Sequence, residues 1–158
     1  MQEFLKEAVV ILPYHKDKVL LQLRDNKPDI VYPNSWGFFG GTIETGEYPM
    51  QSAKRELYEE IGYESDEMSY LSIDRISAPY EIIQHSFYCP LKIQVEEINL
   101  HEGFDFGFFT LEEIRSKQLF STKGKKKYPV IDHPCMEYLV SKLMQKIDGK
   151  LSKETGVA

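Results

Sequence analysis

The chain has 158 residues, of which 42% are apolar and 13% aromatic, and its 25 acidic residues outnumber 19 basic ones to give a formal charge of −6. This length and apolar content predict one folded domain with its own core and exclude a disordered chain. The negative charge argues against a nucleic-acid polymer as partner, because such a footprint is basic. It does not exclude small anions that a metal ion bridges.

The two cysteines, Cys89 and Cys135, lie far apart, and the sequence contains no Cys-x-x-Cys or close-spaced histidine pair. A disulfide framework or structural zinc site is therefore disfavoured, and free thiols in a reducing cytoplasm are expected. The first apolar run, residues 8–12, is too short for a membrane span. We expect a soluble, cytoplasmic protein with no membrane partner.

The first part of the chain predicts a hairpin and then a loop. Residues 7–14 and 18–24 are rich in Val, Ile and Leu and flank a short turn, which is typical of two paired strands. Residues 25–35 contain two prolines and no periodicity, so they predict a loop. A short aromatic strand, residues 36–39, then leads into Gly40-Gly41.

Residues 49–61 predict an amphipathic helix. Pro49 suits its first turn, and Gly62 suits the stop, where a left-handed residue is favoured. The apolar positions recur at three- and four-residue steps and form one stripe: Met50, Ala53, Leu57 and Ile61.

The remaining chain alternates strands with helices. Strands are predicted over residues 68–76, 82–95 and 104–109, with breaks near Pro79 and Pro90. Thr110 with Glu113 has the spacing of a capping box. Further on, we expect a solvated lysine-rich loop over residues 123–127, a helix over 132–147 and a frayed tail over 148–158. The pattern predicts a single α/β domain spanning residues 1–158, with a mixed sheet between helices.

Three glutamates converge on one face of the predicted helix. At about 100° per residue, Glu59 and Glu60 fall on either side of Glu56, away from the apolar stripe. Such repulsion is unfavourable unless a cation offsets it, and carboxylate oxygens favour Mg²⁺, with Mn²⁺ as the alternative. A plain solvated acidic face is the competing interpretation. The preceding Gly40-Gly41, where the backbone can approach a ligand closely, favours a metal site for phosphate esters.

Residues 41–63 resemble the Nudix box, G-x5-E-x7-R-E-U-x-E-E-x-G-U, in which U is a bulky aliphatic residue. Leu57 fills the first U, and Tyr63 departs from the second. Phe39 stands where a common form of the family has Pro. All fixed positions are met, namely by Gly41, Glu47, Arg55, Glu56, Glu59, Glu60 and Gly62.

The resemblance implies the Nudix fold, an α/β/α sandwich with a mixed sheet, and hydrolysis of a nucleoside diphosphate linked to another moiety. It implies that Glu56, Glu59 and Glu60 bind Mg²⁺ with help from the Gly40 carbonyl. It also implies that Glu47 and Arg55 pair and hold the loop against the helix. The general base is left open between a glutamate of the box and one outside it.

Several other residues are candidates with competing structural roles. Glu56 is the first choice for the general base, and Glu102 is the candidate outside the box, although it can equally be a loop carboxylate. Arg24 can meet a phosphate or form a surface ion pair, and Trp36 can stack on a base or belong to the core. With Gly40 and Gly41, these two form the expected substrate-binding set.

The substrate is less defined than the family. Pro79 matches a marker of ADP-ribose hydrolases and Tyr80 one of dinucleoside polyphosphate hydrolases, so the two markers conflict. The compact length favours a nucleoside triphosphate or oxidised dNTP pyrophosphatase, with nucleotide-sugar hydrolysis also open. A non-catalytic nucleotide-binding module is the rival class, but the complete glutamate set favours an enzyme. Homodimerisation stays open.

Overall fold

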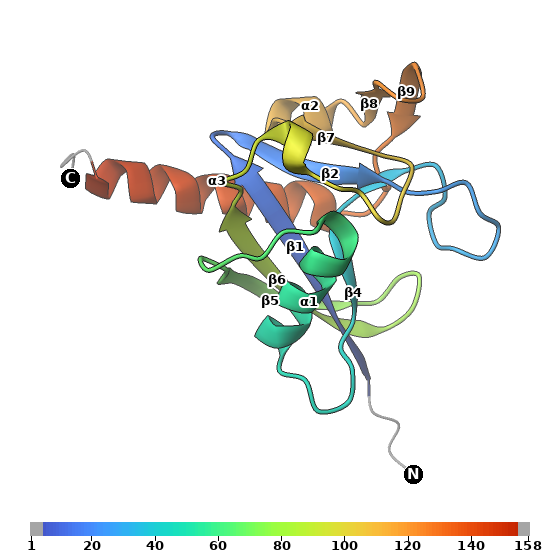
Figure 1. Cartoon of the computed structure of the whole chain (residues 1–158). Helices are drawn as coiled ribbons and strands as arrows, with labels where there is room; N and C mark the ends of the chain where they lie inside the picture. The colour runs from blue at the N-terminus through green and yellow to red at the C-terminus, as the bar shows by residue number, and fades with distance from the viewer. Residues whose placement is uncertain (1–4, 155–158) are drawn as a thin grey trace, which may run out of the picture.

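The computed structural model describes the backbone of residues 5–154 and the side chains of residues 5–149 (Figure 1). It confirms the predicted α/β class. The elements are, in chain order, β1 (Lys6–His15), β2 (Lys18–Leu23), β3 (Trp36–Gly37), β4 (Phe39–Thr42), α1 (Pro49–Ile61), β5 (Ser69–Ile76), β6 (Ile82–Pro90), η1 (Val95–Glu97), β7 (Asp105–Phe109), α2 (Leu111–Arg115), β8 (Gln118–Ser121), β9 (Lys126–Pro129) and α3 (Cys135–Glu154).

The main sheet has seven strands and is mixed, as predicted. Its order is β3-β2-β1-β6-β5, while β4 pairs with β1 and β7 pairs with β2. Strands β1 and β6 run parallel, in register from Lys6 opposite Ile82 to Tyr14 opposite Pro90, and the other pairs are antiparallel. Strand β1 is therefore central, and its first half carries β4 and its two glycines.

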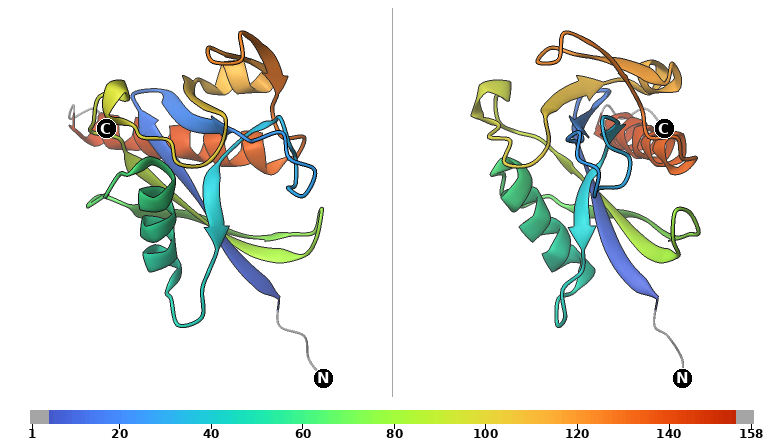
Figure 2. Two further views of the ribbon diagram at one scale, coloured as in Figure 1. Left: turned by 45° about the vertical axis from the view of Figure 1, so that its right-hand side comes forward. Right: turned by 90° about the vertical axis from the view of Figure 1, so that its right-hand side faces the viewer.

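Helices α1 and α3 lie on opposite sides of the sheet, which gives the α/β/α sandwich (Figure 2). On one face, Leu57 and Ile61 of α1 pack with Phe87 of β6 in one apolar cluster. On the other face, Leu139 and Leu143 of α3 pack in a second cluster under the same sheet. The domain thus has one apolar core on each face of the sheet. The ends of the strands lie outside both cores and can contribute residues to a binding site.

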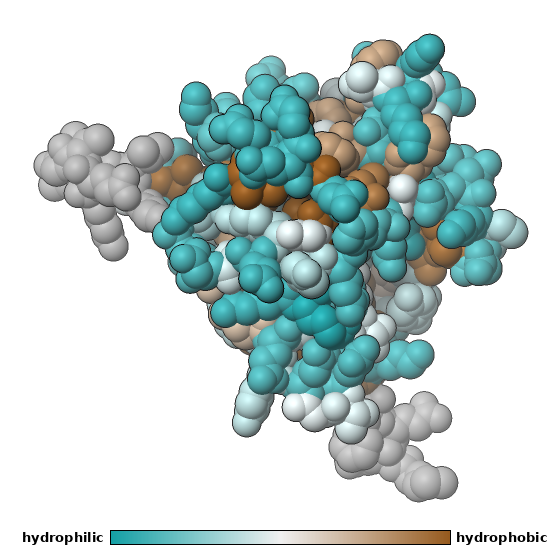
Figure 3. All heavy atoms as spheres, in the orientation of Figure 1, coloured by the Kyte–Doolittle hydropathy of each residue, from teal (hydrophilic) through white to brown (hydrophobic). Residues whose placement is uncertain are grey.

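Helix α1 has the predicted bounds because its ends carry the right residues. Pro49 occupies the first turn, and Gln51 Oε1 accepts a hydrogen bond from Tyr48 N at 2.8 Å. Gly62 adopts a left-handed conformation (φ 72°) and donates to Tyr58 O at 2.8 Å. The face of the molecule in Figure 3 is mostly hydrophilic, and its apolar side chains gather near β7 rather than over α1, as an amphipathic helix requires.

Some boundaries differ from the expected ones. Strand β6 ends at Pro90, which has no N–H for the ladder, so the predicted break near Pro90 is confirmed and no strand continues to residue 95. The lysine-rich segment is not simply a loop, because Lys126 and Lys127 pair with β8 as part of β9. The helix expected to end at residue 147 runs to Glu154, and residues 155–158 of the predicted tail lie outside the described residues.

Three further features concern the described residues. The capping box of α2 is confirmed: Thr110 Oγ1 accepts from Glu113 N at 3.1 Å, and Glu113 Oε1 accepts from Thr110 N at 3.0 Å. Both cysteine thiols are free, with Cys89 buried and Cys135 half-buried. Within residues 5–154, no helix is long and apolar enough to cross a membrane.

Candidate active site

The glycine strand β4 meets the glutamate face of α1 directly. Gly40 N donates to Glu60 Oε2 at 3.1 Å. A Cβ atom at Gly40 would overlap the Val9 carbonyl oxygen on β1, and one at Gly41 would overlap the Glu56 carboxylate. Only glycines therefore let β4 pair closely with β1 while two carboxylates of α1 touch its backbone.

Arg55 joins the loop after β4 to α1. Its Nε and Nη2 donate to the two carboxylate oxygens of Glu47, at 2.8 and 2.9 Å. The pairing that the resemblance implied is thus confirmed, and its two-pronged geometry is the strong form of an arginine–carboxylate bond. Hydrogen bonds from Arg55, and then from Glu44 N, lower the pKa of Glu47 to about 2. Glu47 and Glu56, in turn, raise the pKa of Arg55.

Glu60 is the most buried acid of the cluster, with 2% of its surface exposed. Burial, followed by the charges of Glu56 and Glu102, raises its pKa to about 9, although Gly40 N and the Gln22 amide donate to it. Burial is also the main cause that raises the pKa of Glu56. Glu56 is paired with Arg55, whereas Glu60 forms no ion pair among the described residues.

Glu102 belongs to the same group although it lies outside the motif. It lines a cavity of about 330 Å³ together with Gly40, Glu60, Gln22 and Arg24. The preceding residue fixes this loop on the C-terminal end of α1, because the His101 backbone N donates to the Glu60 carbonyl at 2.8 Å. The structure thus brings Glu102 to Glu60 of α1, as the interpretation of Glu102 as a site residue requires.

A second cavity of about 340 Å³ lies on the other side of the glycines. Arg24 and Gly40 line both cavities, and Gly41, Tyr80 and Gln84 line the second one. Arg24 is held in place by a hydrogen bond from its Nε to the Val31 carbonyl at 2.8 Å. The expected substrate-binding residues Gly40, Gly41 and Arg24 therefore stand at the junction of an acidic cavity and a more apolar one.

Trp36 does not belong to this junction. Its side chain is fully buried, its Nε1 donates to the Leu119 carbonyl at 3.0 Å, and its ring meets Phe109 edge-on at 4.9 Å between centroids. The expectation that Trp36 stacks on a substrate base is therefore wrong, and the indole is part of the core. Its hydrogen bond links β3 to the β8–β9 hairpin. This hairpin was not predicted from the sequence.

The carboxylates of Glu56, Glu59 and Glu60 are chemically suited to bind a divalent ion, but their side chains are not oriented toward one common point. Among the described residues, no three His, Cys, Asp or Glu side chains are grouped closely enough to hold a metal ion. Arg55 Nη1 instead engages Glu56 Oε1 at 3.0 Å and Glu59 Oε2 at 3.2 Å. Carboxylate oxygens are the hard donors that Mg²⁺ and Mn²⁺ prefer, so Glu56, Glu59 and Glu60 are the side chains that would hold such an ion.

Comparison with known proteins places this arrangement in a family. The family model described as NUDIX domain matches residues 5–132. The chain belongs to the NUDIX family. A curated relative from Haemophilus influenzae, dihydroneopterin triphosphate diphosphatase, is 35% identical over 91 residues, which cover 56% of this chain and 54% of that protein. The NUDIX chain thus spans about half the length of this relative and less of the next two.

Solved structures share the fold at low identity. The E. coli ORF135 protein has a TM-score of 0.65 and 24% identity, with 89% of each chain covered. The MutT protein from Methanosarcina mazei Go1 has a TM-score of 0.67 and 15% identity, with 92% of this chain and 97% of that chain covered. These likenesses show the NUDIX fold for nearly the whole chain.

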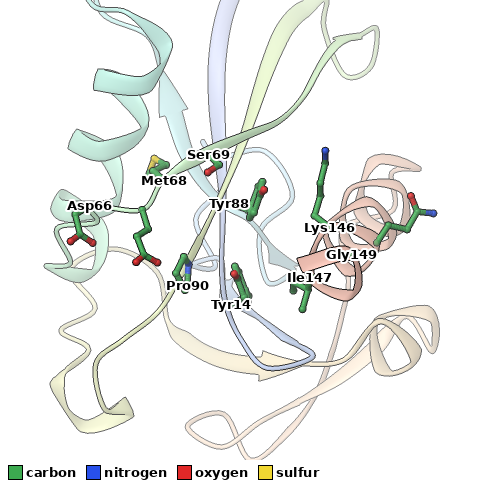
Figure 4. A pocket seen from close by; sticks show the side chains of 11 residues that line it. Tyr14, Asp66, Met68, Ser69, Tyr88, Pro90, Lys146, Ile147 and Gly149 are labelled. Carbon is green, nitrogen blue, oxygen red and sulfur yellow. The ribbon is translucent and has the colours of Figure 1, made fainter. Parts of the chain in front are cut away.

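A cavity larger than these two lies elsewhere in the NUDIX domain. It has a volume of about 630 Å³ and lies between the strands and the end of α3, with Tyr14 and Tyr88 on the strands and Ile147 on the helix (Figure 4). None of the glycines or glutamates of the NUDIX motif lines it. Volume alone therefore does not identify the active site of this domain.

Two buried amides near the site were not found from the sequence. Gln22 is 5% exposed, donates from Nε2 to the Phe38 carbonyl at 3.1 Å and hydrogen-bonds Glu60. Gln84 is 7% exposed and lines the second cavity. A usable signal existed for Gln22, which interrupts an otherwise apolar strand, where a polar side chain needs a partner. Gln84 is followed by His85 and Ser86, so it does not stand out in its strand.

Proposed function

We propose that this NUDIX domain hydrolyses a phosphoanhydride bond in a nucleoside diphosphate linked to another moiety, and that its substrate is a nucleoside triphosphate or an oxidised dNTP. One observation carries the proposal. Glu56, Glu60 and Glu102 meet at Gly40, between an acidic cavity and a second cavity large enough for a base. A phosphate chain can therefore lie by the acids while the nucleoside extends past the glycines.

The metal ligands in this proposal are Glu56, Glu59, Glu60 and the Gly40 carbonyl. Mg²⁺, or Mn²⁺ in its place, would offset the charge of the diphosphate and polarise it when bound. Arg55 holds Glu47 through two hydrogen bonds and keeps the loop after β4 on α1. Arg24, at the junction of the cavities, is the cation of this set that can contact a phosphate.

The chemical step is an in-line displacement by water. The water oxygen forms a bond to one phosphorus as the bridging P–O bond breaks, and the bridging oxygen leaves with the other phosphate. A carboxylate takes the proton of the water. We assign this role to Glu56, whose pKa is raised by burial, and keep Glu102, which lines the acidic cavity, as the second candidate.

The relatives define which other substrates must be compared. One curated relative is described as a dihydroneopterin triphosphate diphosphatase, two are RNA pyrophosphohydrolases, and a solved structure is a C. elegans Ap4A hydrolase complex. These activities are those of the relatives.

A non-catalytic nucleotide-binding module is the rival function, and the complete set of motif glutamates argues against it. We place the enzyme in the cytoplasm, as its two free thiols suggest.

The test is a turnover screen of the purified protein with Mg²⁺ and then with Mn²⁺. The panel contains NTPs, 8-oxo-dGTP, dihydroneopterin triphosphate, ADP-ribose, a nucleotide sugar and a dinucleoside polyphosphate. We expect the highest kcat/KM on a nucleoside triphosphate, with pyrophosphate and a nucleoside monophosphate as products, and none in EDTA. Higher kcat/KM on another class would replace the substrate proposed, and no turnover on any of them would overturn the enzyme.

A further inference from the structure

Gln84 on β6 carries a polar atom that the fold leaves without a partner. Its side chain is 7% exposed, and its Nε2 is buried with no hydrogen-bond acceptor among the described residues. Ser86 Oγ, two residues further along the strand, is also buried without a partner. Buried amides in proteins are nearly always hydrogen-bonded, so an orphaned one at a cavity wall indicates a partner that comes from outside.

The alternation of side chains along β6 places Gln84 on the side of α3. Phe87 and Cys89 pack in the cluster of α1, whereas Tyr88 packs against the cluster of α3. Gln84 lies four residues before Tyr88 and therefore shares its face. On that face it lines the second cavity, which continues to Gly40 and Gly41.

The neighbouring strands do not supply the missing acceptor. In the sheet, Gln84 stands between Ala8 of β1 and Asp74 of β5. Asp74 accepts instead from the Ser72 hydroxyl, from Oγ to Oδ2 at 2.7 Å. The described residues that line the second cavity include no Asp or Glu, so no carboxylate of this lining can accept a hydrogen bond from the Gln84 carboxamide.

The lining of the second cavity suits a flat ring with a polar edge. Its walls are largely apolar and include Phe38, Ile82 and Met136, with Tyr80 at an exposed position. A carboxamide holds a donor beside an acceptor in one plane, and it pairs best with a ring edge that presents an acceptor beside an N–H. Nucleobases and related fused nitrogen heterocycles have such an edge.

We infer that Gln84 reads the heterocyclic base of the substrate, through paired hydrogen bonds between its carboxamide and the donor–acceptor edge of that base. This inference rests on the proposed function, which places the phosphates of the substrate beside the glutamates. The base of the same substrate then lies against Gln84. Gln84 is then a specificity-determining residue, and its buried amide is retained for binding rather than for stability.

Binding of nucleoside monophosphates tests this inference without requiring turnover. We would measure the affinity of GMP, AMP and ribose 5-phosphate by calorimetry for the wild type, for Gln84→Met and for the control Gln94→Met, in which an exposed glutamine is changed. Methionine nearly preserves the volume of glutamine but cannot make the paired hydrogen bonds.

We expect the wild type and Gln94→Met to bind GMP or AMP at least tenfold more tightly than ribose 5-phosphate. Gln84→Met should reduce this preference to about threefold or less, leave the affinity of ribose 5-phosphate unchanged and keep or raise Tm. The inference is overturned if the wild type has no preference for a base, or if Gln84→Met keeps it. Failure of the proposed function would be distinct, because it appears as absent turnover whatever the binding results.

Discussion

Arg55 and Glu47 are joined by two parallel hydrogen bonds, of 2.8 and 2.9 Å, that tie the loop after β4 to α1. The same guanidinium reaches Glu56 and Glu59 at 3.0 and 3.2 Å. Arg55 therefore binds two kinds of carboxylate. Glu47 has a structural role, whereas Glu56 and Glu59 belong to the proposed metal site. A lysine at position 55 would keep the positive charge but could not replace Arg55, because only the planar guanidinium presents two parallel N–H donors to one carboxylate.

Arg55→Lys should release Glu47 from its low pKa. The folded pKa of about 2 lies below the ordinary value of 4.5, so the ionised form stabilises the fold above about pH 4.5, and this stabilisation is lost as pH falls through 2. In the variant, an NMR titration should give a Glu47 pKa much closer to 4.5, because lysine cannot form both bonds. An unchanged pKa of about 2 in the variant would contradict the assigned role of the pair.

Gly40→Ala should destabilise the domain. The added Cβ meets the Val9 carbonyl oxygen, a backbone atom inside the β1–β4 pairing that cannot turn aside. We expect a loss of about 1–3 kcal/mol in the free energy of unfolding, measured by urea denaturation. Gly149→Ala is the control, since a Cβ there meets nothing within 4 Å and alanine favours the helix. Equal stabilities of the two variants would contradict the close approach at Gly40.

The two thiols should be unreactive near neutral pH. Burial raises the pKa of both Cys89 and Cys135 to about 11, and Asp74 adds to the effect at Cys135. Since only the thiolate reacts, alkylation by iodoacetamide should be slow at pH 7.5 and should accelerate as the pH rises toward 11. Mass spectrometry should find Cys135 labelled before the fully buried Cys89, and both labelled rapidly in urea. Fast labelling of Cys89 in the native protein would show that its burial is wrong.

The general base can be assigned by comparing two variants on the best substrate of the screen. Glu56→Gln should lower kcat by about 10²- to 10⁴-fold at saturating Mg²⁺, because the proton acceptor is lost. Glu102→Gln should lower kcat much less, since Glu102 reaches the acidic cavity from a loop outside the helix. The reverse order would assign the proton transfer to Glu102.

The fold was predictable wherever local chemistry and the tertiary structure agree. Helix α1 has the predicted bounds because Pro49 and Gly62 mark its ends and its apolar stripe has helical spacing. The β8–β9 hairpin was missed because its strands are only four residues long and β9 lies in a lysine-rich segment, and because distant contacts stabilise it. Among these are hydrogen bonds from Ser121 Oγ and Lys123 N to Asp105 Oδ2, at 2.6 and 3.2 Å.

The acids of the site were predictable from their spacing, but their environment was not. The sequence places Glu56, Glu59 and Glu60 on one side of a helix without showing that Glu60 is buried and Glu59 is half-exposed. That difference depends on how β4 packs on α1, which is a long-range contact. The same limit applies to Gln84 and to Trp36, whose partners, the second cavity and Leu119, lie far away in the sequence.

The central claim is that the α1 glutamates form a metal-dependent catalytic centre, and Glu59→Gln tests it most directly. Its carboxylate is half-exposed and removes no core contact, so the variant should fold like the matched control Glu64→Gln. We predict that, on the substrate that the wild type turns over best with Mg²⁺, Glu59→Gln lowers kcat by at least 10²-fold while Tm stays within a few degrees. Turnover by Glu59→Gln at the level of the wild type and of Glu64→Gln would contradict the account.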